Sequence, residues 1–184
     1  MPRLRQVSND QANDKTQKLF NGVNAKLGTV PNMMRAMGNS PAVLSSYLSF
    51  SGGLAAGTFT NQQRELIALA VGQTNECDYC LAAHSALGKM AGLSDTQIQD
   101  ARRAESVDAK DEALVKLSVK MVEQRGHVSE SDLAEFRNQG FEDEHLAELV
   151  ANVALNIFTN YFNHLAETEV DFPAAPPLVV SANN

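Results

Sequence analysis

The sequence TNQQRELIALAVGQTNECDYCLAAHSALGKMAG, residues 60–92, contains both cysteines of the chain within two consecutive helical patterns. Thr60 followed by Gln63 is typical of a capping box, so the first helix is expected to begin there and to continue through an unbroken apolar run at residues 66–71. The second helix is expected over roughly residues 76–90, ending at Gly92. An antiparallel return would place the two helices side by side.

The rest of the chain also shows helical periodicity, and strand patterning is nearly absent. Further helices are predicted over Asn13–Leu27, after Pro31, after Pro41, over Ala113–Gln124 and over Glu142 to about Thr168, with capping boxes at Ser94/Gln97 and Ser129/Asp132. The predicted fold is therefore a compact all-α domain of about seven to nine helices.

The domain organisation follows from length and composition. The chain has 184 residues, which favours a single domain, here residues 1–170 with a redox core at about residues 44–103. The proline-rich end, residues 171–184, begins DFPAAPPLVV and cannot continue a helix. We expect it to be an extended arm, either packed on a neighbouring subunit or disordered.

Charge and the N-terminus exclude several classes of protein. The net charge of −7 and the absence of a basic stripe argue against nucleic acid as a partner. Residues 1–17 lack the apolar segment of a signal peptide, and no later run is long enough to span a membrane. A cytoplasmic location is therefore expected, where a close cysteine pair more often serves catalysis or metal binding than structure.

The chemistry of the cysteine pair depends on how a thiolate forms. Cys77 and Cys80 are spaced C-x-x-C at the start of the expected helix, where the helix dipole stabilises an anion and Asn75 is a plausible N-cap. His84 lies one turn after Cys80 and can exchange a proton with its sulfur. A second thiol also allows a sulfenic acid to resolve to a disulfide.

Two other interpretations of the cysteine pair compete with the redox one. Cysteines without function are usually small buried hydrophobic residues, although an adjacent histidine argues against this. A structural zinc site needs four ligands, and only Cys77, Cys80 and His84 are close in sequence, since Glu76 and Asp78 point elsewhere on the helix. The redox interpretation is favoured, with no metal or organic cofactor required.

Glu65, followed after eleven residues by Cys77-x-x-Cys80-x-x-x-His84, resembles the alkylhydroperoxidase AhpD-like branch of the carboxymuconolactone decarboxylase superfamily. The flanking sequence RELIALAVGQTNECDYCLAAHSALGKMAGLS is similar to the core of that branch, and NVALNIFTNYFNHLAETEVDFP is similar to its C-terminal segment. The resemblance implies an all-helical fold that assembles into trimers or hexamers. It also implies a peroxidase whose cysteine pair cycles between dithiol and disulfide.

Site residues are carried over from the resemblance position by position. Cys80 matches the peroxide-attacking cysteine, Cys77 the resolving one, and Glu65 and His84 the proton relay. Tyr79 departs from the pattern, because its position often holds histidine, and a phenol with a pKa of ~10 is a poorer base at neutral pH. Its hydroxyl can still exchange hydrogen bonds with the relay. Dipole arguments alone favour Cys77 as the nucleophile, whereas the resemblance and the position of His84 favour Cys80.

The predicted function is thus a cytoplasmic, antioxidant thiol peroxidase of the alkylhydroperoxide reductase type, an oxidoreductase with peroxiredoxin-like activity. Its partners would be a hydroperoxide substrate, an external dithiol or reductase, and further copies of the chain. The alternatives are a redox-sensing or interaction module whose disulfide is not catalytic and, more remotely, a lactone decarboxylase, although decarboxylases of the superfamily lack the cysteine pair.

Two carboxylates compete for the role of base in this reaction. Glu65 begins a strongly apolar helix and is the predicted base, the alternative being a first-turn glutamate that interacts with Thr60. Glu76 is expected in the first turn of the cysteine helix, where its charge would disfavour a neighbouring thiolate.

Overall fold

The computed structural model describes residues 1–178, and within this range the chain is helical without any β-strand. The predicted all-α fold of seven to nine helices is therefore confirmed. In chain order the nine helices of this range are α1 (Asp14–Leu27), α2 (Asn32–Met37), α3 (Pro41–Leu54), α4 (Asn61–Thr74), α5 (Asp78–Met90), α6 (Asp95–Arg102), α7 (Ala109–Glu123), α8 (Glu130–Asn138) and α9 (Asp143–Ala166). None of these helices is long and apolar enough to cross a membrane.

Side-chain caps begin these helices largely where the sequence predicts them. Capping boxes are present at Thr60, Ser94 and Ser129, where each side chain accepts the N–H three residues later. Gly28 ends α1 with a φ of 74°, a left-handed conformation that glycine adopts without a steric penalty. α7 begins at Ala109 rather than at the predicted position 113, because the Asp108 side chain accepts two N–H groups of its first turn.

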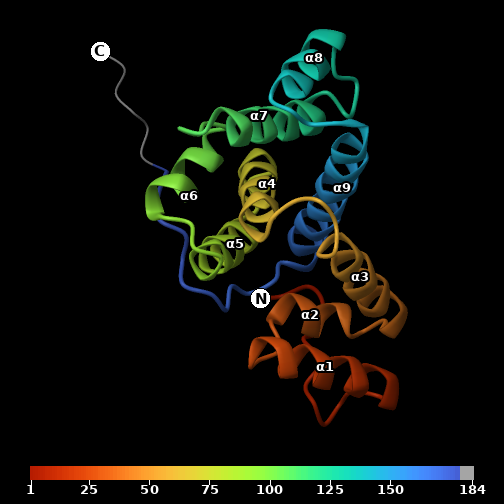
Figure 1. The fold of residues 1–184 in the computed structure, drawn as a ribbon. Coiled ribbons are helices and arrows are strands. Elements are labelled where there is room, and N and C mark those ends of the chain that lie inside the picture. Colours follow the sequence, from red (N-terminus) through yellow and green to blue (C-terminus); the bar gives the residue numbers. More distant parts are fainter. Residues whose placement is uncertain (179–184) are drawn as a thin grey trace.

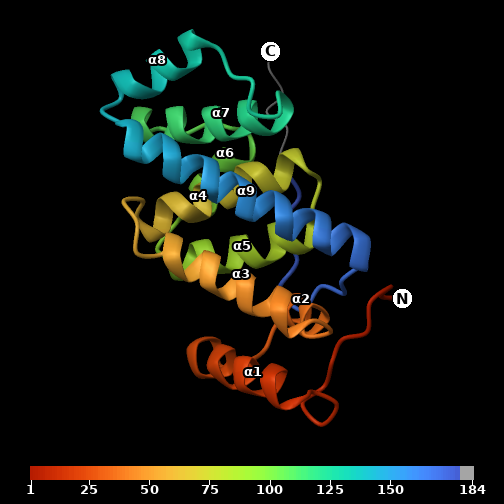
Figure 2. The same ribbon diagram turned by 90° about the vertical axis from the view of Figure 1, so that its right-hand side faces the viewer.

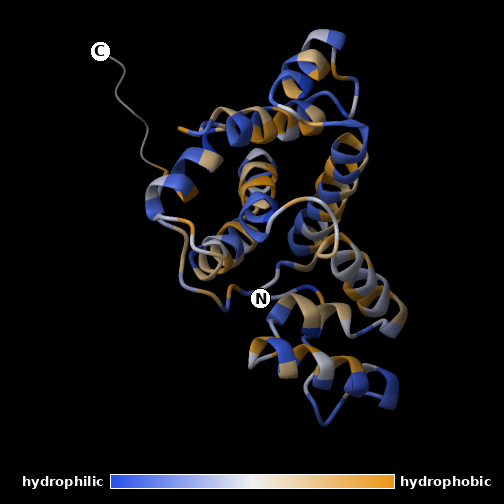
Figure 3. Ribbon diagram, in the orientation of Figure 1, coloured by the Kyte–Doolittle hydropathy of each residue, from blue (hydrophilic) through white to orange (hydrophobic). Residues whose placement is uncertain are grey.

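α4 is the central helix of the fold. Every residue from Leu66 to Gly72 is buried, and α5, α6, α7 and α9 pack around it (Figure 1). This middle part of α4 is apolar on all sides and must be enclosed by other elements, in agreement with its orange colour in Figure 3, where the polar ends of the helix are blue. Because α5 follows α4 after a short turn and packs along it, the cysteines are held against the most buried part of the domain.

The first three helices form a separate layer at one end of the molecule. Figure 2 shows α1 farthest from the α4–α9 bundle, with α2 and α3 between them. Phe20 and Val23 of α1, Met37 of α2 and Leu44 of α3 pack in one apolar cluster that also includes Cys77 and Cys80. The N-terminal layer therefore covers the cysteine end of α5.

The segment that follows α9 packs on its own chain. It crosses from the end of α9 past α5 toward α6 (Figure 1). The Asp171 carboxylate accepts hydrogen bonds from the Asn32 N–H and the Tyr79 hydroxyl, and farther along the Pro176 carbonyl accepts one from Arg102. Asp171 and Pro176 of the predicted arm thus contact their own chain, and the packing of the arm on a neighbouring subunit stays a prediction; residues 179–184 lie outside the described range.

Candidate active site

The turn between α4 and α5 fixes the position of the cysteine pair. The Cys77 N–H donates to the Gly72 carbonyl at 2.9 Å and the Glu76 N–H to the Gln73 carbonyl at 3.1 Å, the two bonds of a Schellman motif. Glu76 occupies the left-handed position of this motif, with a φ of 55°. Cys77 then serves as the N-cap of α5. Cys77 therefore takes part both in the motif that ends α4 and in the cap that begins α5.

This geometry corrects two expectations about the residues before Cys77. Asn75 is the C-cap of α4 rather than the N-cap of α5, and its side chain donates to the Asn160 Oδ1 atom of α9 at 2.8 Å. Glu76 is an exposed residue of the turn rather than part of the first turn of α5. The predicted boundary was too early because the Schellman motif occupies residues that the helical pattern alone assigned to α5.

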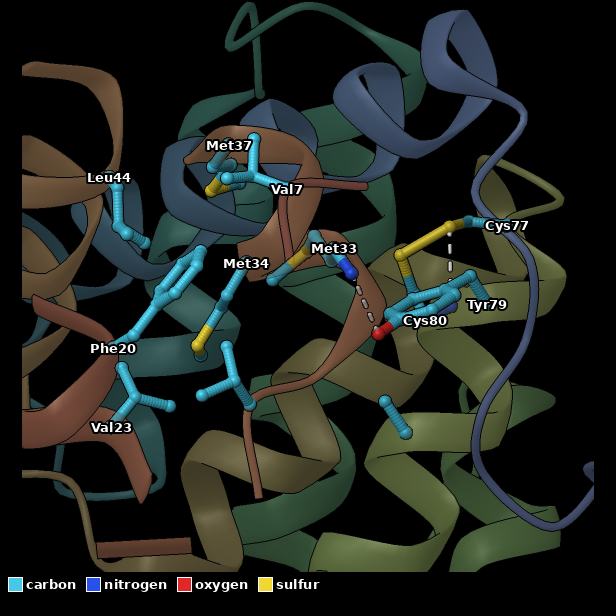
Figure 4. Packing of buried hydrophobic residues seen from close by; sticks show 12 residues of the cluster. Val7, Phe20, Val23, Met33, Met34, Met37, Leu44, Cys77, Tyr79 and Cys80 are labelled. Carbon is cyan, nitrogen blue, oxygen red and sulfur yellow. Dashed lines mark hydrogen bonds between the residues drawn. A yellow bond between two sulfur atoms is a disulfide. The ribbon is translucent and has the colours of Figure 1, made fainter. Parts of the chain in front are cut away.

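Cys77 and Cys80 form a disulfide at the N-terminus of α5 (Figure 4). Their Cα atoms lie 5.3 Å apart, within the usual range for a disulfide. The Cys80 N–H donates to Cys77 Sγ at 3.3 Å, so this sulfur takes the place of the oxygen of an ordinary N-cap. Both cysteines are buried, Cys77 at 0% and Cys80 at 2% exposure.

A cavity of about 140 Å³ opens beside one of the two sulfurs. Cys80 and His84 both line it, whereas Cys77 does not. Its other walls are mainly apolar and come from α1, α2, α3, α5, α9 and the C-terminal segment, including Leu27, Met34, Tyr47, Leu87 and Phe172. A small apolar molecule in this cavity would therefore contact Cys80 rather than Cys77.

Glu65 and His84 are paired across α4 and α5. His84 Nδ1 lies 2.8 Å from Glu65 Oε2, with both side chains about four-fifths buried at 23% and 19% exposure. An ionised carboxylate only accepts hydrogen bonds, so Nδ1 carries the proton and Nε2 is left for proton exchange. The alternative contact between Glu65 and Thr60 is wrong, because Thr60 forms its capping box with Gln63.

Tyr79 uses its hydroxyl in contacts away from this pair. The hydroxyl donates to Asp171 Oδ1 at 2.8 Å and accepts the Met33 N–H at 3.2 Å, the contact drawn in Figure 4. Its ring packs edge-on against Phe172. Burial raises the pKa of Tyr79 well above its ordinary value, with the Asp171 carboxylate adding to the increase. Tyr79 of α5 thus contacts α2 and the C-terminal segment rather than the Glu65–His84 pair.

Two further side chains at the cavity were missed by the sequence analysis. The Asn163 amide of α9 donates to Cys80 Sγ at 3.4 Å and to Met33 Sδ at 3.3 Å. Tyr47 of α3 lines the cavity, and burial together with the Glu65 charge raises its pKa to about 12. Neither residue belongs to the cysteine motif, and both are far from it in the sequence. The only sequence signal for Asn163 is the series of asparagines, at positions 152, 156, 160 and 163, along a mostly apolar helix.

Residues able to hold a metal do not gather elsewhere in the described part of the chain. Within residues 1–178, no three or more histidine, cysteine, aspartate or glutamate side chains lie close enough together to bind a metal ion. The three nearest in sequence, Cys77, Cys80 and His84, include the two sulfurs that are joined in the disulfide.

Fold and site together define a helical domain in which a C-x-x-C disulfide, capping one helix, adjoins a cavity and a carboxylate–imidazole pair. Residues 41–113 match the carboxymuconolactone decarboxylase family. This stretch, less than half of the chain, includes Glu65, Cys77, Tyr79, Cys80 and His84, and it contains the predicted core. The resemblance expected from the motif is confirmed there. The comparison with curated proteins gives no match.

Solved structures share the fold over nearly the whole chain. A peroxidase-related protein from Silicibacter sp. TM1040 is 24% identical, with a TM-score of 0.79 over 91% of this chain and 89% of the other. An alkylhydroperoxidase AhpD core protein from Ralstonia eutropha JMP134 is 20% identical, with a TM-score of 0.84 over 92% of each chain. The debrominase Bmp8, solved with 2,3,4-tribromopyrrole, is 16% identical, with a TM-score of 0.80 over 93% and 92%.

Proposed function

We propose that the protein is a thiol-dependent peroxidase of the alkylhydroperoxide reductase type. The observation that carries this proposal is the position of Cys80. Its sulfur is bonded to Cys77, and it shares a cavity with His84, which is itself hydrogen-bonded to Glu65. The nucleophile and the imidazole therefore share one apolar cavity, with the resolving thiol bonded to the first and the carboxylate hydrogen-bonded to the second.

The oxidative step begins with the reduced pair. His84 Nε2 takes the proton of the Cys80 thiol, and the thiolate attacks the terminal oxygen of the hydroperoxide. An S–O bond forms while the O–O bond breaks, so that sulfur is oxidised and the peroxide is reduced. The departing alkoxide takes the proton back from His84 and leaves as an alcohol. Glu65 orients the imidazole and stabilises its charged form during the transfer.

The resolving step closes the disulfide. The Cys77 sulfur attacks the Cys80 sulfenic acid, the S–O bond breaks, and the hydroxyl leaves with the thiol proton as water. Because Cys77 caps α5 three residues before Cys80, the two sulfurs meet without rearrangement of the helix.

An external dithiol or reductase then restores the reduced pair. One thiolate of the reductant attacks the Cys80 sulfur, which forms a mixed disulfide and releases Cys77 as a thiolate that accepts the Cys80 N–H at the positive end of the α5 dipole. The second thiol of the reductant then displaces Cys80, so that the reductant leaves as a disulfide and both cysteines are reduced. This division of roles reconciles the two arguments from the sequence. The dipole stabilises Cys77 as a leaving group, and the cavity supports Cys80 as the attacking group.

The direct test is steady-state consumption of an organic hydroperoxide such as cumene hydroperoxide, with dithiothreitol as the reductant. We expect many turnovers by the unchanged protein, no turnover by Cys80→Ser, and, when dithiothreitol is left out, a single oxidation of Cys77→Ser to the sulfenic acid without disulfide formation. Turnover that survives Cys80→Ser would overturn the assignment of the nucleophile.

The same assay separates the rival functions. A redox-sensing module would consume one equivalent of peroxide and stop, even with dithiol in excess. A lactone decarboxylase would release carbon dioxide from a lactone acid and remain active after both cysteines are replaced. The cavity that Cys80 and His84 share supports the peroxidase over both of these alternatives.

Assembly into a homo-oligomer, a trimer or hexamer, in the cytoplasm is part of the proposal. Support for assembly comes from exposed large apolar side chains on α3 and α9, namely Phe50, Phe158, Tyr161 and Leu165. Such a group of residues is more typical of an interface than of a free surface. Sedimentation at micromolar concentration checks the assembly, and a monomer would contradict it.

A further inference from the structure

Asn163 brings a polar side chain of α9 to the sulfur that faces the cavity. Its Nδ2 atom lies 3.4 Å from Cys80 Sγ and 3.3 Å from Met33 Sδ. The residue is 4% exposed and lines the same cavity as Cys80 and His84. A buried amide N–H of α9 thus contacts the sulfur that reacts in the proposed function, whereas Cys80 and His84 both belong to α5.

The orientation of this carboxamide follows from the chemistry of its neighbours. Disulfide and thioether sulfurs carry no hydrogen, so the nitrogen of the amide faces them rather than the oxygen. In the disulfide both sulfurs are neutral and accept weakly. Once Cys80 is reduced and ionised, the same N–H faces a full negative charge, and a charge-assisted hydrogen bond is much stronger than a neutral one. The contact therefore strengthens in the state that attacks the peroxide.

The other end of the carboxamide argues against a purely structural role. Asn163 Oδ1 is buried without a hydrogen-bond partner, which disfavours the folded state. A leucine at this position would fill a comparable volume beside Met33 without burying an unpaired oxygen. The interaction of Nδ2 with Cys80 accounts for the presence of an amide here.

We propose that Asn163 is a catalytic residue whose side-chain N–H stabilises the Cys80 thiolate. The inference rests on the proposed function in that Cys80 is taken as the attacking sulfur. His84 accepts the thiol proton, and the Asn163 N–H donates to the resulting S⁻. As the S–O bond forms, the negative charge moves to the departing alkoxide, and the hydrogen bond returns to its weak, neutral form.

Alkylation of the single remaining thiol in a Cys77→Ser background tests the proposal without peroxide. Serine keeps an N-cap acceptor for the Cys80 N–H, so α5 begins as before. The rate of reaction with iodoacetamide, followed from about pH 5 to about pH 10, gives the midpoint pH of thiolate formation. We expect Asn163→Leu to raise this midpoint by about one unit, because the thiolate loses its donor.

Two further variants separate the electrostatic role from a structural one. Asn163→Asp keeps the shape of the side chain but places a carboxylate beside the sulfur, so it should raise the midpoint more than Asn163→Leu. Asn156→Leu removes another buried amide of α9, one that donates to the Asn152 carbonyl, and should leave the midpoint unchanged. The other titratable groups near Cys80 are His84 with Glu65, Tyr47, and Tyr79 with Asp171, and all are retained.

Failure of this proposal is distinguishable from failure of the proposed function. If neither Asn163 variant moves the midpoint, or if Asn156→Leu moves it equally, Asn163 is not the thiolate donor, whatever the peroxide assay gives. If the midpoints shift as expected but the unchanged protein shows no turnover, the donor role stands and the peroxidase does not. With both correct, Asn163→Leu lowers kcat/KM for the peroxide about tenfold below the midpoint and restores it above.

Discussion

Two hydrogen-bonded sets of side chains contact α5, and they are drawn from very different parts of the chain. The first, which we term the relay pair, is Glu65 with His84, 19 positions apart on consecutive helices. The second, the C-terminal clasp, is Asp171 with Tyr79 and Asn32, at separations of 92 and 139 positions. His84 of the relay pair lines the cavity beside Cys80. The clasp binds the last described segment to α2 and α5.

The difference between the two sets separates chemistry from enclosure. Two helices joined by one Schellman turn position the relay pair, so fixed offsets along a short sequence are enough to build it. The clasp exists only after α9 has crossed the domain and returned its end to α5. We therefore expect the relay pair to govern the rate of the proposed reaction and the clasp to govern the stability of the walls of the cavity.

The largest expected effect is on the relay pair. Glu65→Gln keeps the size of the side chain but removes the charge that orients His84 and stabilises its protonated form. We expect kcat/KM for an organic hydroperoxide to fall at least about tenfold, or ~1.4 kcal/mol of transition-state stabilisation. Steady-state kinetics with excess dithiol measure this.

Glu76→Gln is the matched control for that substitution. Glu76 is the glutamate next to Cys77 in sequence, yet it is exposed in the turn before α5. Little change in rate is expected from it. A larger loss from Glu76→Gln than from Glu65→Gln would show that the proton relay is assigned to the wrong carboxylate.

The same contrast explains which features the sequence revealed. Periodicity and capping residues predicted the helices because both act within a few positions, and the motif placed Glu65 on the helix that packs against the one bearing His84. The turn was misread because Glu76, not glycine, adopts the left-handed conformation, so no residue type marked it. Asn163 and Asp171 reach the site only through the path of α9, which local patterns do not encode.

The second prediction concerns the clasp. Tyr79→Phe removes the donor to Asp171 and the acceptor of the buried Met33 N–H, while the ring keeps its contact with Phe172. We expect the free energy of unfolding to fall by about 1 kcal/mol, as measured by urea denaturation. Peroxide turnover should change by less than about twofold, because the hydroxyl does not contact the relay pair. A tenfold loss of turnover with unchanged stability would instead place the Tyr79 hydroxyl in the relay.

The smallest expected effect uses two tyrosines as reporters at alkaline pH: Tyr47, which is electrostatically coupled to Glu65 of the relay pair, and Tyr79 of the clasp. Burial and the Glu65 charge raise the pKa of Tyr47 from its ordinary value of 10.0 to about 12, and the pKa of Tyr79 is raised mainly by burial, with Asp171 adding to it. A group whose pKa is higher in the folded state contributes stability that is complete below the unfolded pKa and is lost as pH rises through the folded one. Each tyrosine should therefore destabilise the protein above about pH 10, through the range in which the unfolded chain ionises first.

Phenylalanine cannot ionise, so Tyr47→Phe should flatten this decline in the free energy of unfolding. Because Tyr47 is partly exposed, solvent screening should keep its share below about 1 kcal/mol at pH 11.

Combining Tyr47→Phe with Glu65→Gln tests the link to the relay pair. Once Glu65 is neutral, the Tyr47 phenolate is opposed by burial alone, so Tyr47→Phe should flatten the decline less than it does with Glu65 intact. The same comparison with Tyr79→Phe should depend on Glu65 much less, because the charged neighbours that raise the pKa of Tyr79 are Asp171 and, more weakly, Tyr47, and Glu65 is not among them. If Glu65→Gln altered the contributions of both tyrosines equally, the relay pair and the clasp would be electrostatically coupled, and the separation of chemistry from enclosure would not hold.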